Sequence, residues 1–356
     1  MDDIERIIKK DINTVLGKLK QNKNKSTYAY NLIDLSLLYD LCDIFDVSDI
    51  FDNQITNYDF IFYKKYKNIE KILNDNFFKL FIKNKDFIKW AAISIAEALN
   101  CYNFYPVEFK NVIKEKEAVN ITLDFLKHYN NNIYNLLKTV SKDNKIFMTD
   151  NFISYGVTCF STTENFSPYI IIEQQYNIMD SITLAHEITH VYYMSRQNFS
   201  KNYYKINASN SCFNEIPTYT LELYFYEWLK ENRICSNDNK ILYNLIFLYI
   251  YNEAKYFINY FKKNLNLSQN FETIISDDFK LKLYDFIGIL FAFYFYSIKD
   301  LEKIDSIFKK FYDSKKIPTL EEIISDYGLN YEDIINFKYG KKLAKNLYGY
   351  NGGTNE

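Results

Sequence analysis

Residues that break helices are scarce in this sequence. Its 356 residues include 8 glycines and 4 prolines, far below the usual shares of about 7% and about 5%. Sandwiches and barrels of β-strands need many tight turns, and these two residue types supply most of them. The sequence therefore predicts a mainly α protein of long helices, and its 34 tyrosines and 30 phenylalanines can fill a sizeable core.

Apolar residues recur at helical spacing through most of the chain, beginning at residues 4–19. The stretch 141–168 differs, because it holds Gly156, several serines and threonines, and a β-prone run around 153–158 that is followed by another at 169–172. We predict a small β-hairpin or sheet there, just before the next helix. From about residue 176 the pattern again predicts helices, as far as a glycine- and asparagine-rich tail.

Charge and cysteine usage limit the partners and the compartment. The formal net charge is −2, so no excess favours nucleic acid or an anionic membrane. Five separated cysteines without a C-x-x-C pair argue against a disulfide framework and favour a reducing compartment. The N-terminus has no apolar signal region, and the longest apolar run, 286–296, is too short to span a membrane and predicts a buried helix. We expect a cytoplasmic protein without nucleic-acid or membrane partners, and the oligomeric state is left open.

One segment, residues 186–190, contains the pattern H-E-x-x-H. Residues four apart share a helix face, so His186 and His190 can present two imidazoles to one Zn²⁺. Glu187 lies about 100° from His186 around the helix, where it can accept a proton from zinc-bound water. Zinc lowers the pKa of that water toward ~7, so a carboxylate is a sufficient base. The alternative is a chance pair of surface histidines, in a chain that has only three histidines.

A catalytic zinc needs a third protein ligand and an open position for water. Glu215 is a candidate, because Asn214 could cap a helix that starts near residue 214 and Pro217 is tolerated in a first turn. Glu222 lies two turns further along and could accept a hydrogen bond from a ligand imidazole. The alternative for Glu215 is a carboxylate that binds no metal and is favoured at a helix N-terminus by the helix dipole. The alternative for Glu222 is a solvated surface side chain.

The run E-I-P-T-Y-T-L-E at 215–222 resembles the E-x-P-S-x-x-L-E segment of the thimet oligopeptidase and oligoendopeptidase F family of zinc metallopeptidases. Two earlier stretches, S-P-Y-I-I-I at 167–172 and D-S-I-T-L-A-H at 180–186, resemble that family's P-Y-I-L-L-N and D-V-F-T-L-A-H blocks. The resemblance covers roughly residues 150–230. It implies zinc ligation by His186, His190 and Glu215, Glu187 as general base and acid, and a helical body with a small sheet beside a deep cleft for peptides.

The chain also departs from this family. Thr189 stands where the family usually has glycine, although a threonine hydroxyl can bond back to the helix. The chain is much shorter than typical members, so the family's restriction to short peptides need not apply. The family often also uses a histidine from a late helix, and the comparable region here, 283–292, has none. The third histidine of the chain, His128, lies in an earlier helix and is expected to be packed or at the surface.

The family uses a tyrosine from that late helix to stabilise the oxyanion. Tyr284 matches the start of the family's Y-D segment, and we predict it as the oxyanion donor. A second expected tyrosine is missing near residues 290–291, where Tyr294 or Tyr296 could substitute. The alternative for each of these tyrosines is a core or surface role.

These observations predict a multi-helix zincin-like metallopeptidase fold with a small β-sheet next to the active-site helix. The expected regions are an N-terminal helical region at 1–140, a zinc-peptidase catalytic region at 141–348 and a flexible tail at 349–356. The expected activity is hydrolysis of peptides or oligopeptides with one Zn²⁺, and the substrate is expected to add along an edge strand within 150–172.

Two other functions are compatible with the sequence. A non-catalytic zinc-containing protein derived from such a peptidase could still bind peptides, and the missing tyrosine near 290–291 motivates this alternative. The intact Glu187 argues against it, because a structural zinc needs no base beside it. The third candidate is a helical interaction protein without metal, which bound zinc at unit stoichiometry would exclude.

Overall fold

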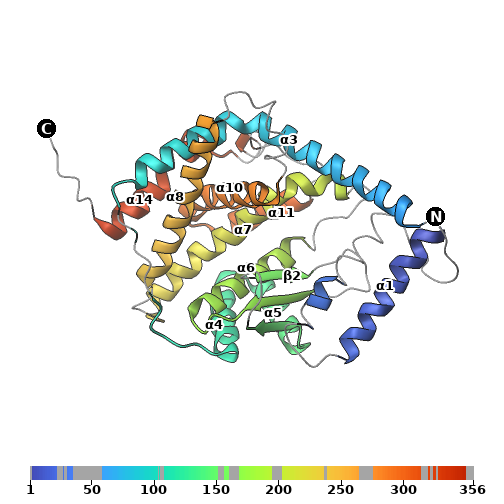
Figure 1. Cartoon of the computed structure of the whole chain (residues 1–356). Coiled ribbons are helices and arrows are strands. Elements are labelled where there is room, and N and C mark those ends of the chain that lie inside the picture. The colour runs from blue at the N-terminus through green and yellow to red at the C-terminus, as the bar shows by residue number, and fades with distance from the viewer. Residues whose placement is uncertain are drawn as a thin grey trace. The chain divides into compact units, whose positions relative to one another are not determined.

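In the residues that the structure describes, the chain is mainly helical and carries one small β-sheet (Figure 1). The computed structural model describes residues 2–21, 27, 30–34, 58–102, 104, 108–150, 156–159, 168–194, 203–235, 239–263, 276–313, 320, 324–325 and 328–349. Two compact units make up the chain, and each combines two separate stretches of sequence. The first comprises Met1–Leu73 and Ile113–Asn207, and the second comprises Asn74–Val112 and Ala208–Glu356.

The sheet of the first unit has three strands, β1 (Ile146–Thr149), β2 (Gly156–Cys159) and β3 (Tyr169–Glu173), in the order β1-β3-β2. Strand β1 runs parallel to β3, with Ile146 opposite Ile170, and β2 runs antiparallel to β3, with Gly156 opposite Ile172. The middle of β3 is fully buried, as expected for a central strand rich in isoleucine. Among the described strands, β2 therefore lies at an edge of the sheet.

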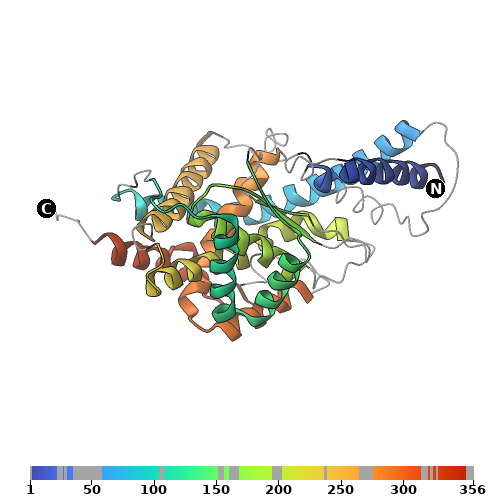
Figure 2. The same ribbon diagram turned by 90° about the horizontal axis from the view of Figure 1, so that it is seen from below.

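The helix α6 (Ile178–Met194) follows β3 directly and packs against β2, β3, α4 (Glu115–Tyr129) and α5 (Asn131–Lys142). Figures 1 and 2 show these green and teal elements side by side. A buried hydrogen bond of 2.9 Å from the Thr122 hydroxyl to the Ser181 carbonyl joins α4 to the first turn of α6. The first unit also contains α1 (Asp2–Gln21). The sheet and the two helices thus hold α6 on several sides.

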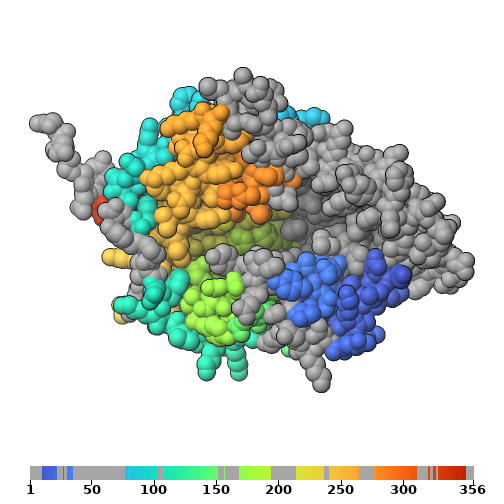
Figure 3. Space-filling model, viewed as in Figure 1, coloured from blue at the N-terminus to red at the C-terminus, as the bar shows by residue number. Residues whose placement is uncertain are grey.

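The second unit is all helical in the part of the chain that the structure describes. It contains most of α7 (Tyr203–Glu231) and the later part of α3 (Tyr58–Leu99). Its other helices are α8 (Asn239–Lys263), α10 (Asp277–Ile298), α11 (Leu301–Asp313), α13 (Tyr331–Ile335) and α14 (Lys338–Tyr348). In Figure 3 the yellow-orange surface belongs to α8, which packs on α10 through the stacked rings of Phe247 and Phe293, 5.3 Å apart.

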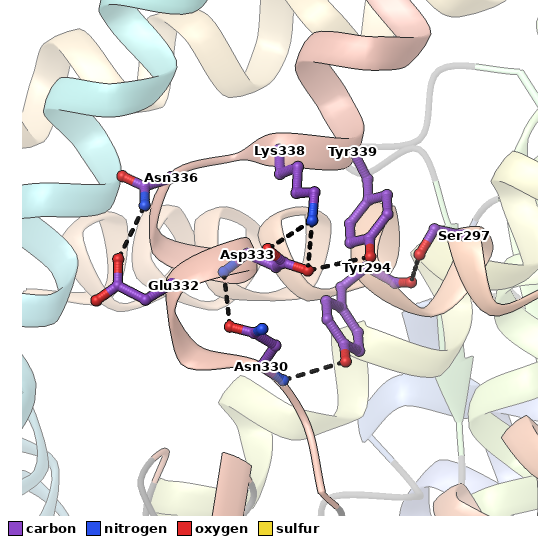
Figure 4. Close-up of polar contacts among 8 residues, drawn as sticks. All are labelled: Tyr294, Ser297, Asn330, Glu332, Asp333, Asn336, Lys338 and Tyr339. Atoms are coloured by element: carbon purple, nitrogen blue, oxygen red, sulfur yellow. Dashed lines mark hydrogen bonds and ion pairs between the residues drawn. The ribbon is translucent and has the colours of Figure 1, made fainter.

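Polar side chains join α10, α13 and α14 near the end of the chain (Figure 4). The Lys338 ammonium donates to both carboxylate oxygens of Asp333 at 2.9 and 3.0 Å, and the Tyr339 hydroxyl donates to the same carboxylate at 3.1 Å. The backbone N–H of Asn330 donates to the Tyr294 hydroxyl on α10 at 3.1 Å. These contacts complement the apolar packing of α10 against α13 and α14.

The predicted fold class is confirmed, and two of its details need correction. Strand β1 lies in the stretch singled out for β structure but outside both β-prone runs, while residues 153–155 of the first run lie outside the described residues. The helix expected to start near 214 instead begins at Tyr203, so Pro217 lies inside it. The apolar run 286–296 is part of α10. Among the described residues, only the segment Asp278–Ile298 of this helix is long and apolar enough to cross a membrane. Since 61% of its most apolar stretch is buried within the protein, the predicted buried helix is confirmed.

Candidate active site

The helix α6, which carries H-E-x-x-H, begins at a turn held by a buried carboxylate. Asp180, in the first turn, accepts hydrogen bonds from the backbone N–H groups of Gln175 and Tyr176 at 2.8 and 3.0 Å. Burial raises the pKa of Asp180, and the backbone donors act in the opposite direction. The side chain of Asn177 accepts from the N–H of Met179 at 2.8 Å. The start of α6 is thereby fixed against the end of β3.

The two histidines of the motif meet on one face of α6. Their Nε2 atoms lie 3.0 Å apart, and their ring centroids lie 4.8 Å apart. Both side chains are half-buried, whereas the neighbours Ala185 and Ile188, on other faces of the helix, are fully buried. Two nitrogens at about 2.0–2.1 Å from one tetrahedral zinc would lie about 3.3 Å apart. The observed pair therefore fits the geometry that one zinc ion requires.

Glu187 points toward the edge strand of the sheet. Its side chain is buried, with 6% of its surface exposed. A Cβ atom at Gly156 of β2 would lie 2.6 Å from Oε1 of Glu187 and 2.7 Å from Cγ2 of Thr183, so only glycine lets β2 run this close to α6. The first unit thus places a buried carboxylate between the histidine-bearing helix and a strand edge.

Thr189 occupies its position in the way that the sequence predicted. Its hydroxyl donates to the carbonyl of Ala185 at 2.7 Å, one turn back on α6, and the side chain is buried. The hydroxyl is therefore satisfied within the helix, and the substitution for the family's glycine is accommodated locally. His128 is exposed on α4, and its Nδ1 atom lies 2.7 Å from the carbonyl of Asp124, which confirms its surface position.

Glu215 belongs to the second unit, in the turn of α7 that precedes Pro217. Its side chain is half-buried, and the Thr218 hydroxyl lies 2.9 Å from its carbonyl and 3.3 Å from its Oε2. Proline removes one hydrogen bond of the helix, and the Thr218 hydroxyl supplies another donor in the same turn. On the facing helix α10, Gly288 is so close that an added Cβ would lie 2.5 Å from Cβ of Glu215.

Glu222 is buried, with 9% of its surface exposed, and accepts a 2.9 Å hydrogen bond from the hydroxyl of Tyr226. The alternative of a solvated surface side chain is therefore wrong for Glu222. Burial, together with the carboxylate of Glu222, raises the pKa of Tyr226 well above its ordinary value. Tyr226 thus stays protonated at neutral pH and remains a hydrogen-bond donor to Glu222.

A second carboxylate, Asp285 on α10, receives hydroxyl donors from two other helices. Tyr219 of α7 donates to its Oδ1 at 2.9 Å, and Tyr249 of α8 donates to its Oδ2 at 2.6 Å. Burial, then Asp285 and Glu215, raise the pKa of Tyr219 well above its ordinary value. Burial and Asp285 also raise the pKa of Tyr249. Both phenols therefore keep their protons and serve as donors near neutral pH.

The tyrosines considered as oxyanion donors lie in different surroundings on α10. Tyr284 is half-buried, and its ring meets that of Phe77 edge to face with centroids 5.8 Å apart. Tyr294 belongs to the cluster of Figure 4. The ring of Tyr296 lies under the ammonium of Lys299, 3.5 Å from its centroid, and against the ring of Tyr224. Tyr294 and Tyr296 thus both make contacts within the second unit, and the donor role of Tyr284, or of either substitute, stays a prediction.

Five neighbours of the candidate residues were missed by the sequence analysis. Tyr219 and Asp285 lie within segments that carry the family resemblance, so their positions offered a signal. Gly156 and Gly288 are two of only 8 glycines, and the rarity of glycine in the chain was a weaker signal. Nothing in the sequence pointed to Tyr249, because its contact with Asp285 joins two separate helices.

Comparisons with known proteins found two similar solved structures and one similar sequence. No family model matches the chain. A protein from Bacillus anthracis strain Ames, assigned as an oligoendopeptidase F, has a TM-score of 0.52 and 11% identity, over 94% of this chain and 65% of its own. A protein from Chlamydophila abortus, assigned as a peptidase, has a TM-score of 0.42 and 13% identity, over 91% of this chain and 60% of its own. Reticulocyte-binding protein homolog 1 of Plasmodium falciparum (isolate 3D7) is 24% identical over 181 residues, 44% of this chain and 6% of that protein.

The first structural similarity, at 11% identity, shows a shared fold. The chain therefore has a mainly helical fold of the kind seen in that oligoendopeptidase F structure. It spans less than two thirds of the length of each protein that it matches. One fold can carry different activities, so the residues of the site decide the function.

Proposed function

We propose that this chain is a zinc-dependent metallopeptidase in which His186, His190 and Glu215 hold one Zn²⁺. The observation that carries the proposal is the pair of Nε2 atoms 3.0 Å apart, next to the buried Glu187. Two imidazoles and a carboxylate form a known donor set for catalytic zinc. The sequence resemblance supports Glu215 as the carboxylate, although it lies in the other compact unit.

When bound, zinc supplies a Lewis acid that polarises the scissile carbonyl and lowers the pKa of water. The protein's own groups account for the proton transfers. The carboxylate of Glu187 accepts a proton from the attacking water and afterwards returns it to the leaving amine. Tyr284 is the proposed donor to the oxyanion, and Glu222 the proposed partner of a ligand imidazole.

The substrate is proposed to be a peptide or oligopeptide that adds to the edge of the sheet at β2. An extended peptide can pair with an exposed strand edge through main-chain hydrogen bonds. Gly156 of β2 lies against Glu187, so a peptide paired there would run beside the proposed base. A cytoplasmic location, and the absence of nucleic-acid and membrane partners, stay predictions.

Zinc content and peptide cleavage test this proposal when they are measured on the same preparations. We expect the purified protein to cleave a mixed peptide library and to lose this activity with a chelator. Glu187→Gln should retain zinc but lose hydrolysis, and Glu215→Ala should contain less zinc by elemental analysis. Cleavage by Glu187→Gln at the wild-type rate would show that the proposed base is wrong. A protein that holds zinc and peptide without cleavage would instead be the non-catalytic binding protein.

A further inference from the structure

Asp285 connects three helices of the second unit through one carboxylate. Its Oδ1 accepts from Tyr219 on α7 at 2.9 Å, and its Oδ2 accepts from Tyr249 on α8 at 2.6 Å. Hydrogen bonds to a charged acceptor are stronger than neutral ones, and they restrict both partners. Asp285 therefore fixes the Tyr219 side of α7 and the Tyr249 side of α8 relative to α10.

The same part of α7 carries Glu215. Glu215 and Tyr219 are four residues apart, so they share one face of the helix. Asp285 and Gly288 are three residues apart on α10. Asp285 accepts the hydrogen bond from Tyr219, and Gly288 lies close against Glu215. The two contacts lie one turn apart on each helix. Together they set how α7 is rotated about its own axis at Glu215 and how closely it approaches α10 there.

We propose that Asp285 is a positioning residue that acts through Tyr219 to hold Glu215 in place for metal binding. This inference rests on the proposed function, because it takes Glu215 to be a zinc ligand. A ligand carboxylate has to be held within about 0.5 Å of its productive position. Polar groups that orient metal ligands typically change metal affinity 10–100-fold when they are removed.

The structure offers a matched pair of variants. Tyr219→Phe and Tyr249→Phe each remove one hydroxyl donor from the same carboxylate and leave the ring in place. Only Tyr219 lies on the helix that carries Glu215. If Asp285 had a purely structural role, the two variants would change zinc affinity equally. If Asp285 positions Glu215, Tyr219→Phe should lower zinc affinity more than Tyr249→Phe. Asp285→Asn, which keeps the shape of the side chain, tests the carboxylate itself.

Zinc affinity is measured by competition with a chromophoric chelator, and the thermal midpoint of the zinc-free protein is measured in parallel. We expect Tyr219→Phe and Asp285→Asn to weaken zinc binding about 10-fold or more, and Tyr249→Phe to change it less than about 3-fold. The two tyrosine variants should lower the zinc-free midpoint by similar amounts. Wild-type affinity in Tyr219→Phe, or equal losses in both tyrosine variants, would overturn the positioning role.

The proposed function has its own readout in this experiment. A wild-type protein that binds no zinc, or a Glu215→Ala variant that binds it as tightly as the wild type, would overturn both proposals. If the wild type binds zinc and Glu215→Ala binds it weakly, Glu215 is supported as a ligand. The pair Tyr219→Phe and Tyr249→Phe then decides the role of Asp285 alone.

Discussion

Gly288 of α10 lies directly against Glu215 of α7. A Cβ atom at Gly288 would lie 2.5 Å from Cβ of Glu215 and 3.1 Å from its carbonyl carbon and oxygen. A separation of 2.5 Å is shorter than real Cβ atoms show, 3.1 Å is tight, and two of the three atoms belong to the backbone, which cannot rotate away. Glycine at this position therefore sets how closely the two helices approach at Glu215.

Replacing Gly288 by alanine should destabilise the protein and weaken zinc binding. Alanine gains up to about 1 kcal/mol of helix propensity, but overpacking of a filled site typically costs about 1–3 kcal/mol, and here the backbone has to move. Urea denaturation and chelator competition measure the two effects. Gly17→Ala on α1 is the control, because nothing lies within 4 Å of the added atom, and it should stabilise by about 0.5–1 kcal/mol. Equal stabilisation by both variants would contradict the close approach.

Gly156→Ala should impair hydrolysis while zinc stays bound. The new atom would lie 2.6 Å from Oε1 of Glu187, so the carboxylate has to move, and the three atoms nearest to it belong to Glu187 and Thr183 and not to a histidine. A displacement of about 1 Å can cost about 100-fold in rate, and we expect kcat to fall at least ~10-fold. Stopped assays on a fluorogenic peptide and elemental analysis for zinc check this. Thr183→Ala is the control, because it alters the other side chain near Gly156 and leaves Glu187 in place. An unchanged kcat in Gly156→Ala would refute the effect of this close contact on Glu187.

The carboxylate of Glu253 should make stability depend on pH. Glu253 is buried on α8, and the Lys282 ammonium lies 3.8 Å from its Oε1. Burial raises the pKa of Glu253 from 4.5 to about 7. The folded state therefore binds more protons than the unfolded state between those values, so the free energy of unfolding falls as pH rises from about 4.5 to about 7, by on the order of 1–3 kcal/mol.

Urea midpoints at pH 5 and pH 8 measure this dependence. Glu253→Gln carries no charge at either pH and should lose less stability than the wild type between pH 5 and pH 8. The exposed Glu231 on α7 provides the control, because Glu231→Gln should leave the difference between the two pH values as it is in the wild type. A Glu253→Gln variant with the full wild-type difference would assign the pH dependence to other groups.

Asp180→Ala should loosen the turn from β3 into α6. The substitution removes the acceptor for the N–H groups of Gln175 and Tyr176, and partly buried donors left without a partner cost about 1–3 kcal/mol. We expect a lower thermal midpoint and faster amide hydrogen exchange at residues 175–176. Asp180→Asn keeps one acceptor oxygen and should lose less. Unchanged exchange in Asp180→Ala would show that the turn is held by other contacts.

Local patterns predicted the helical architecture well. The scarcity of glycine and proline indicated long helices, and the motif at 186–190 placed His186 and His190 on one helix face because that spacing is a property of any α-helix. The start of α7 was misjudged, since Pro217 usually marks a first turn and here lies inside the helix. Neighbouring packing can offset the cost of such a proline, and that packing is not visible in the local sequence.

Contacts between distant segments could not be predicted. The burial of Glu187 depends on β2, which starts 31 residues earlier in the chain, and the donor from Tyr249 to Asp285 joins α8 to α10. The two compact units are each assembled from separate stretches, a feature that no composition change marks. The division into an N-terminal helical region at 1–140 and a zinc-peptidase catalytic region at 141–348 stays a prediction.

The edge position of β2 limits which peptide sequences such an enzyme could distinguish. A peptide that pairs with the four residues of β2 is recognised over only about 13 Å, at ~3.3 Å per residue, and mostly through backbone groups that all amino acids share. Proline is the exception, since it has no amide hydrogen to donate. Oligopeptides with proline at a paired position should therefore survive exposure to the enzyme, while composition elsewhere along them matters little.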